Sequence, residues 1–340
     1  MNELLTKTDR KKSSPIAWII KGSFALAVTV LALWWSARDV PLDIVQERLS
    51  TTDWMVVAMY IGAQFVIHGV RTIRWGLLVR PLGQPSRRAV FSAASVGIPA
   101  AMFLPLRLGE FVRPVMIRRA GVPFASGLAS VVVERAADGL TNVGLFFALL
   151  SLLPETAVVA PEIRIGAKIA LGVFGGACIV LVLVGLARQR ALSIISQILD
   201  PFSKPFSKKI TDLLATFLTG LRPLVQPGRG LAFIALTITY WALNGYVTWE
   251  LICSYGIDVP LLAGPFTVSV LVFAVMVPAG PAFIGPMQAG FKAGLAAYAV
   301  SATDSLVVGI TAHLATVFSF SIILALGFLA AEPKTPSDKG

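Results

Sequence analysis

The sequence predicts an all-α integral membrane protein, and three observations support this fold class. Hydrophobic residues make up 56% of the 340 residues and charged residues only 14%, whereas charged residues are about a quarter of a typical soluble domain. The mean hydropathy is +0.79. Apolar runs of the length needed to cross a bilayer as a helix recur along the chain. We therefore expect one polytopic membrane domain.

Six apolar segments are long enough to be full spanning helices. They cover residues 15–36, 54–70, 124–153, 165–187, 231–255 and 305–330. The first has no small-x-small cleavage site at its end and closes with two tryptophans, which prefer the membrane interface, so we interpret it as a span and not a signal peptide. The membrane domain is therefore predicted over residues 15–330, between tails at 1–14 and 331–340.

The basic residues predict the orientation of the chain. The formal net charge is +11, but the basic residues lie between hydrophobic runs and not in one patch, so nucleic acid is not an expected partner. Segment 188–229 holds seven Lys or Arg against two Asp, which places it in the cytoplasm by the positive-inside rule. We expect both tails to be cytoplasmic and the protein to lie in the cytoplasmic (inner) membrane.

That orientation requires residues 89–122 to enter the membrane and return on the same side. We therefore predict a re-entrant or broken helical hairpin there. Residues 261–300 contain too many prolines and glycines for one continuous helix, so we predict a second broken hairpin, entering from the opposite side. Paired interrupted segments in the two halves of a chain indicate a transporter-type site near the middle of the bilayer.

Segment 188–229 mixes apolar and basic residues and contains three prolines. Its apolar residues recur near helical spacing, as at Ile194, Ile198, Leu214 and Leu218. This pattern is typical of amphipathic helices lying on a membrane surface, which is our interpretation. Ordinary soluble linker helices are the alternative.

Charged residues inside the membrane domain are the main functional candidates, because the bilayer makes them costly. Arg107, Glu110 and Arg113 are spaced i, i+3, i+6 and can share one helix face. A second group consists of Glu134, Arg135 and Asp138, in which the two acids are spaced i, i+4. The six could be a buried ion-pair cluster that joins two helices, or arginines that bind an anionic headgroup through bidentate contacts. The two interpretations are compatible.

Further candidates lie on the second span and on the second hairpin. Arg71 and Arg74 are either interfacial anchors or part of a headgroup path, and the hairpin residues form either a ligand site or a tight packing corner. The full set of predicted substrate-binding residues is Arg71, Arg74, Arg107, Glu110, Arg113, Glu134, Arg135, Asp138, Pro281, Gly285, Gln288 and Lys292.

Enzyme and metal signatures are not found in the sequence. There is no phosphate-binding loop, no H-E-x-x-H and no G-x-S-x-G motif. Cys178 and Cys253 both lie within apolar segments, and with only two histidines a zinc site is not expected. We predict no cofactor, no metal and no catalytic residue, and membrane lipids as the partners.

Four motifs together resemble a known family. They are R-W at 74–75, P-x-R-x-G-E-x-x-R at 105–113, E-R-x-x-D at 134–138 and P-x-x-x-G-x-x-Q at 281–288. The chain resembles, over roughly residues 15–330, the flippase-like membrane domain of lysylphosphatidylglycerol synthases. It departs from the family pattern at Ala282 and Phe283, where glycines are usual, and at Gln288, where an acid is usual. An Asn that commonly precedes the first motif is replaced within Ala100–Met102.

The resemblance implies a lipid translocase. In the fused enzymes a cytosolic domain attaches lysine to phosphatidylglycerol, and the membrane domain is credited with moving the product across the bilayer. This sequence ends after the membrane domain, so we expect translocation or lipid binding without aminoacyl transfer. One alternative is an enzyme or enzyme subunit of lipid-linked sugar metabolism, with Glu110, Glu134 or Asp138 as acid–base groups. Another is a non-catalytic scaffold that uses segment 188–229.

Overall fold

The computed structural model describes residues 52–331, except 154–156, 158, 202, 222–225 and 277–280, together with residues 34, 43, 47, 49 and 50. The regular elements in this part of the chain are all helices, with no strand among them, so the predicted all-α class is confirmed. The predicted span at 15–36 and the tails at 1–14 and 331–340 lie outside the described residues, apart from Trp34 and Ala331.

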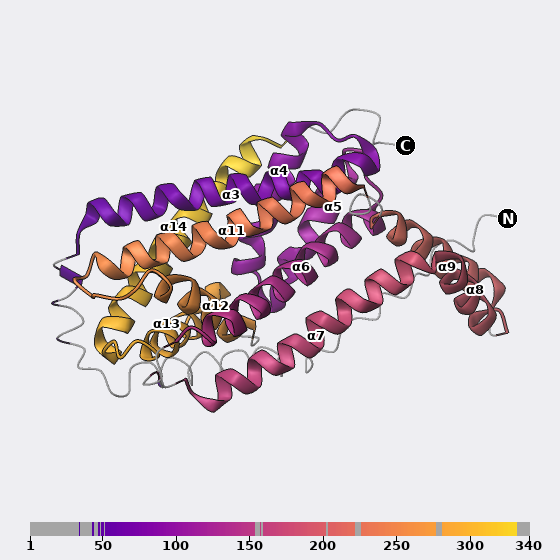
Figure 1. The fold of residues 1–340 in the computed structure, drawn as a ribbon. Helices are drawn as coiled ribbons and strands as arrows, with labels where there is room; N and C mark the ends of the chain where they lie inside the picture. The colour runs from indigo at the N-terminus through magenta and orange to yellow at the C-terminus, as the bar shows by residue number, and fades with distance from the viewer. Residues whose placement is uncertain are drawn as a thin grey trace.

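Five long helices form the bundle shown in Figure 1. They are α3 (Trp54–Gly83), α6 (Phe124–Leu150), α7 (Pro161–Leu186), α11 (Pro227–Cys253) and α14 (Ala302–Leu329). Within the described ranges, α3, α7, α11 and α14 are long and apolar enough to cross a membrane. Helix α6 has 27 residues, or about 40 Å at 1.5 Å per residue, and so exceeds the hydrocarbon thickness as well. These helices confirm a polytopic membrane protein.

Helix α3 is longer than the sequence pattern predicts. The expected span ends at Val70, but the helix continues to Gly83. It begins with Asp53, whose side chain caps the backbone N–H of Met55, and ends at Gln84 in a left-handed conformation. Arg71 and Arg74 are therefore inside a continuous helix and not at its membrane-surface end.

The first broken hairpin is built from α4 (Arg87–Phe103), the 3₁₀ helix η1 (Pro105–Phe111) and α5 (Val112–Arg118). Helix α4 has 17 residues, about 26 Å, and falls short of a full span. Both η1 and α5 fold back against α4. A Cβ atom on Gly109 would overlap the backbone of Ala100 and Ala101, so this glycine permits the close return of the chain.

The second broken hairpin is built from α12 (Ala263–Met276), η2 (Pro281–Phe283) and α13 (Pro286–Ala296). Helices α12 and α13 pack against each other. At the turn, Ala282 and Phe283 have φ angles of 59° and 57°, and Gly285 has a φ angle of 91°. The two non-glycine residues therefore occupy a left-handed conformation that glycine adopts more easily. They are the positions at which the family pattern has glycines.

The two hairpins lie toward opposite ends of the bundle, as α4 and α5 at one end and α12 and α13 at the other show in Figure 1. Their turns nevertheless meet, because η2 contacts α4 and the Arg107 Nη2 donates a hydrogen bond of 2.7 Å to the Val275 carbonyl oxygen. The paired hairpins expected from the sequence are thus present in the structure. Their meeting point is inside the bundle.

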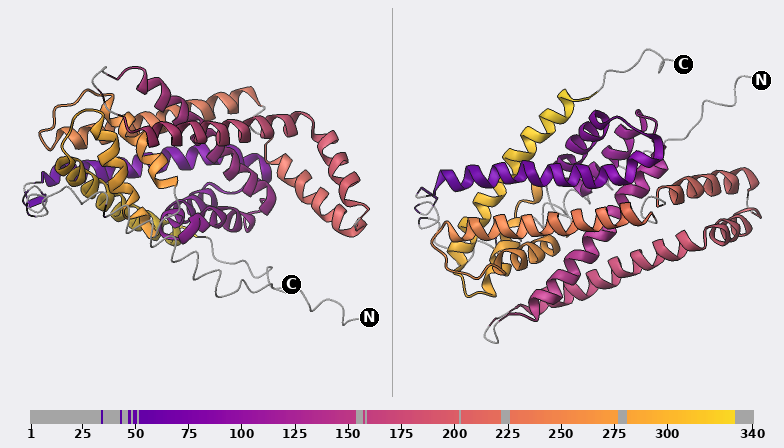
Figure 2. Two further views of the ribbon diagram at one scale, coloured as in Figure 1. Left: turned by 90° about the horizontal axis from the view of Figure 1, so that it is seen from below. Right: turned by 45° about the horizontal axis from the view of Figure 1, so that its top comes forward.

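Helices α8 (Arg188–Leu199) and α9 (Lys204–Thr219) pack together and extend beyond the bundle, at the end that also holds α4 and α5 (Figures 1 and 2). None of the residues of α8 is buried. Large apolar side chains are exposed on both helices, among them Ile194, Ile198, Phe206 and Leu213. An exposed apolar face next to basic residues fits the predicted interfacial position, which stays a prediction.

Candidate functional site

Two carboxylates on α6 are paired with arginines from two other helices. Arg74 of α3 donates to both oxygens of Asp138, with Nη–O distances of 2.6 and 2.9 Å, and to Glu134 Oε1 at 2.7 Å. Arg113 of α5 donates to the other oxygen of Glu134 and to Glu110 Oε2 at 3.0 Å. The side chains of Arg74 and Glu134 have no exposed area. Charges buried this deeply require such pairing.

Arg135 completes the group that we name the ion-pair network: Arg74, Glu110, Arg113, Glu134, Arg135 and Asp138. Its guanidinium lies 3.3 Å from Asp138, 3.6 Å from Glu134 and 3.8 Å from Glu110. Three arginines face three acids, so the network has no net charge. It ties α3, η1, α5 and α6 together in the middle of the protein.

The network differs in one member from the cluster that the sequence spacing suggests. That cluster contains Arg107 and leaves Arg74 as a possible interfacial anchor. In the structure Arg74 is fully buried at the centre of the network, and Arg107 forms no ion pair with any described residue. The reason is the length of α3, which continues past Val70 and carries Arg74 alongside α6.

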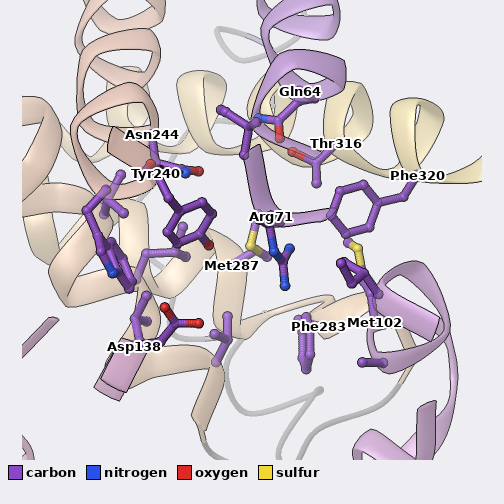
Figure 3. Close-up of a pocket in the computed structure, with 18 of the residues that line it drawn as sticks. Gln64, Arg71, Met102, Asp138, Tyr240, Asn244, Phe283, Met287, Thr316 and Phe320 are labelled. Atoms are coloured by element: carbon purple, nitrogen blue, oxygen red, sulfur yellow. Dashed lines mark hydrogen bonds between the residues drawn. The ribbon is translucent and has the colours of Figure 1, made fainter. Parts of the chain in front are cut away.

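A cavity of about 400 Å³ adjoins the network where the two hairpin turns meet. Its charged lining residues are Arg71, Arg107, Glu110, Arg135 and Asp138. Other polar side chains also line it, among them Gln64, His68, Tyr240, Asn244, Thr248 and Thr316. Much of the remaining wall is apolar and includes Met102, Met287 and Phe320, so the cavity can hold a molecule with a polar and an apolar part (Figure 3).

Arg71 points into this cavity, one helical turn before Arg74. Figure 3 shows its side chain extending into the middle of the pocket, with Tyr240 to the left in the view and Phe283 below. The guanidinium carbon lies 5.5 Å from the centre of the Tyr240 ring, a cation–π distance. Its Nε atom is buried without a hydrogen-bond partner, and no described carboxylate lies within ion-pair distance. Arg71 is therefore a cation of the cavity wall that forms no ion pair with an acid of the described chain.

Arg107 is the second cation of the cavity wall without an acidic partner in the described ranges. It sits at the turn of the first hairpin with a φ angle of 55°. Besides its hydrogen bond to Val275, its guanidinium lies 5.4 Å from the centre of the Phe283 ring. Both partners belong to the second hairpin, so Arg107 bridges the two turns.

The residues of the second hairpin that were predicted to bind substrate lie at its turn and along α13. Gln288 Oε1 accepts a hydrogen bond of 2.9 Å from the Gly285 N–H, and its amide nitrogen lies 3.0 Å from His313 Nδ1. His313 Nε2 in turn lies 2.7 Å from the Ala282 carbonyl oxygen. These bonds fix the turn. Gly285, Gln288 and Lys292 do not line the cavity, and Pro281 begins η2.

Some residues of the cavity were not identified as candidates from the sequence. Tyr240 is the main example, because it covers the guanidinium of Arg71 and lies 5.1 Å from that of Arg74. The available signal was Asn244, a polar residue within the same span and four positions later, which places both on one helix face. Phe283 was noted only as a departure from the family pattern.

Comparison with known proteins agrees with the resemblance. A family described as "Lysylphosphatidylglycerol synthase TM region" matches residues 22–325. The glycosyltransferase AglD of Haloferax volcanii is 24% identical over 301 residues, covering 81% of this chain and 48% of AglD. A UPF0104 membrane protein of Methanothermobacter thermautotrophicus is 25% identical over 298 residues, covering 81% of this chain and 82% of that protein. This chain therefore spans about half the length of AglD. No solved structure matches the chain.

The family match includes both hairpins, the ion-pair network and the cavity. The long apolar helices agree with its description as a transmembrane region. The chain therefore belongs to the lysylphosphatidylglycerol synthase transmembrane-region family and is a polytopic membrane protein.

Proposed function

We propose that the protein is a lipid translocase that moves a lipid with a polar, charged headgroup across the membrane. The observation that carries the proposal is the cavity of about 400 Å³, lined by five charged side chains, at the meeting point of the two hairpins. A headgroup is too costly to place in hydrocarbon, and a polar cavity lowers that cost. The lipid tails would remain in the bilayer beside the bundle.

The ion-pair network supports this role by keeping the cavity walls in place. Asp138, Glu110 and Arg135 belong both to the network and to the cavity wall. Their charges are already paired, so the wall is polar without an unpaired acid. A headgroup would then meet a hydrated surface with a fixed shape, which is what a path through the membrane requires.

The proposal is tested by filling the cavity. Thr316 lines the cavity from α14, and two positions earlier Leu314 is 64% exposed on the outer face of the same helix. We expect Thr316→Trp to reduce the rate of headgroup-labelled lipid translocation in proteoliposomes at least about tenfold, because the indole occupies the headgroup space. Leu314→Trp is the matched control and should keep the wild-type rate.

Equal rates in the two tryptophan variants, with both inserted and monodisperse, would remove the cavity from the transport path. Absence of translocation by the wild-type protein for anionic, cationic and polyprenyl-linked lipids would contradict the translocase proposal itself. The measurement is dithionite quenching of lipids labelled in the headgroup.

An enzyme or enzyme subunit of lipid-linked sugar metabolism is the second candidate. It is favoured by the relative AglD, which is named a glycosyltransferase, although the match covers only about half of AglD. Against it, Glu110, Glu134 and Asp138 are each bound by arginines, which leaves them poorly placed to exchange protons. Sugar transfer by the purified protein to or from a polyprenyl-phosphate carrier would favour this candidate over translocation.

A further inference from the structure

We infer that the cavity selects a lipid phosphodiester whose headgroup is a neutral polyol, with the phosphate bound by Arg71 and Arg107. This inference rests on the proposed function and names the class of lipid that the same cavity would accept. It also sets this chain apart from a carrier of lysine-bearing lipids, the product after which its family is named.

The first argument is the charge of the cavity. The ion-pair network contains three arginines and three acids and is neutral as a unit. Arg71 and Arg107 stand outside it and have no acidic partner within 4.0 Å among the described residues. The network and these two arginines together carry a surplus of two positive charges, and the side chains that line the cavity, three arginines against two acids, carry a surplus of one. A bound anion would neutralise part of that surplus in a low-dielectric site, where the interaction is much stronger than in water.

The second argument is the unused bonding capacity of Arg71. A guanidinium carries five N–H donors in one plane. The Tyr240 ring covers one face of the Arg71 guanidinium, while Nε is buried without an acceptor, and Figure 3 shows the group directed into the cavity. A buried donor without a partner is costly. A phosphate is the ligand whose oxygens fit the planar donor fork best.

The third argument is the position of Arg107. It donates through Nη2 to the Val275 carbonyl oxygen at 2.7 Å, which leaves other donors of the same fork for a ligand in the cavity. Because Phe283 stacks near this guanidinium, the charge is held at the hairpin turn and directed along the cavity wall. Arg71 from α3 and Arg107 from the first hairpin line the same cavity, so a phosphate bound there would have two cationic side chains to contact.

The fourth argument concerns the rest of the headgroup. The remaining polar lining is neutral and includes Gln64, Asn244, Thr248 and Thr316. Amide and hydroxyl groups pair well with hydroxyl groups of a ligand. The two acids of the lining, Glu110 and Asp138, are bound by arginines of the network, so neither is left to bind an ammonium group. A lysyl headgroup, with two positive charges, would face a wall of its own sign.

Two kinds of lipid share the proposed chemistry: a glycerophospholipid with a glycerol headgroup and a polyprenyl-phosphate sugar. We would titrate the purified full chain with four lipids and follow binding by native mass spectrometry. Phosphatidylglycerol and a polyprenyl-phosphate hexose carry the phosphodiester and a polyol. Lysyl-phosphatidylglycerol adds positive charge, and a diacylglycerol hexoside lacks the phosphate. We expect at least one of the first two to bind about tenfold or more tightly than both of the others, and the tighter of the first two identifies the source.

Variants assign the phosphate to its arginines. Arg71→Gln and Arg107→Gln should each weaken binding of the preferred phosphodiester about tenfold, the effect of roughly one charge-assisted contact. They should not weaken binding of the hexoside. Arg119→Gln, at an exposed arginine after α5, removes the same charge away from the cavity and should bind as the wild type does. Folding of each variant is checked by size exclusion and thermal unfolding.

Binding of lysyl-phosphatidylglycerol or the hexoside as tightly as the preferred phosphodiester with a neutral polyol headgroup would overturn the inference. So would an unchanged dissociation constant in folded Arg71→Gln and Arg107→Gln, and the wild-type lipid series decides even where a variant does not fold. The proposed function fails separately: phosphodiester binding without translocation in proteoliposomes contradicts only the translocase. Translocation of lysyl-phosphatidylglycerol without phosphodiester binding contradicts only the inference made here.

Discussion

Arg71 and Arg74 lie one turn apart on α3, and their surroundings are opposite. Arg74 is fully buried and bound to Asp138 and Glu134, while Arg71 faces the cavity without an acidic partner within the described chain (Figure 3). The charges of the ion-pair network thus hold four elements together, whereas Arg71 and Arg107 in the cavity wall have no acidic partner among the described residues. Within one helical turn, the same residue type is paired with acids at one position and lacks an acidic partner among the described residues at the next, and only the second is a candidate for binding a ligand.

This comparison predicts that substitution of Arg74 has the largest effect on stability and that substitution of Arg71 has little. Arg74→Ala leaves Glu134 and Asp138 without a main partner, so we expect the free energy of unfolding to fall by about 3–5 kcal/mol. Arg71→Ala removes a cation that has no ion-pair partner among the described residues, so we expect a change of less than about 1 kcal/mol. Both are measured by reversible unfolding in mixed micelles. Equal losses of stability would show that the two arginines do not have the separate roles described.

A substitution where η1 packs closely against α4 in the first hairpin should have an intermediate effect on stability. Gly109→Ala places a methyl group into the backbone of Ala100 and Ala101, and we expect a loss of about 1–3 kcal/mol from the resulting displacement. Gly144→Ala is the control, because a Cβ atom at Gly144 on α6 meets no other atom within 4 Å. Alanine favours a helix over glycine, so this control should be neutral or stabilising by up to about 1 kcal/mol. A neutral Gly109→Ala variant would argue against the packing of η1 on α4.

A substitution in the strained turn of the second hairpin should have the smallest effect on stability. Ala282 has a φ angle of 59°, which a side chain makes unfavourable, so we expect Ala282→Gly to be stabilising by less than about 1 kcal/mol. Ala297, with a φ angle of −65°, is the control, and Ala297→Gly should be destabilising. The same unfolding measurement checks both. A loss of stability in Ala282→Gly would mean that the left-handed conformation of Ala282 costs less than the entropy that glycine adds to the unfolded chain.

The sequence predicted the architecture better than the site. Apolar run lengths and the Pro- and Gly-rich stretch were enough to find the long helices of the described chain and the second hairpin, because those signals are local. The first hairpin was indicated by the charge of the loops. The charged partners could not be found in the same way. Spacing showed that Arg107, Glu110 and Arg113 can share a face, but Arg74 joins α6 from 60 positions earlier, and its place depends on how far α3 continues.

Some of the motif residues shape the backbone, and others line the cavity. Gly109 is needed where η1 returns against α4, and Gln288 fixes the turn of the second hairpin through the Gly285 N–H, so these motif positions shape the backbone. The cavity cations, Arg71 and Arg107, were in the predicted set. Only the structure separates them from the arginines of the ion-pair network, because pairing depends on contacts between distant helices.

Arg74 anchors the adjacent turn of α3, and the Tyr240 ring covers one face of the Arg71 guanidinium. We therefore expect the side chain of Arg71 to have little conformational freedom before a ligand binds. Capture of an anion then carries a small entropic penalty, since the receptor group is preorganised before the ligand arrives. Such a site would distinguish ligands by shape and charge and not by adapting to them. It should respond steeply to small changes in headgroup chemistry.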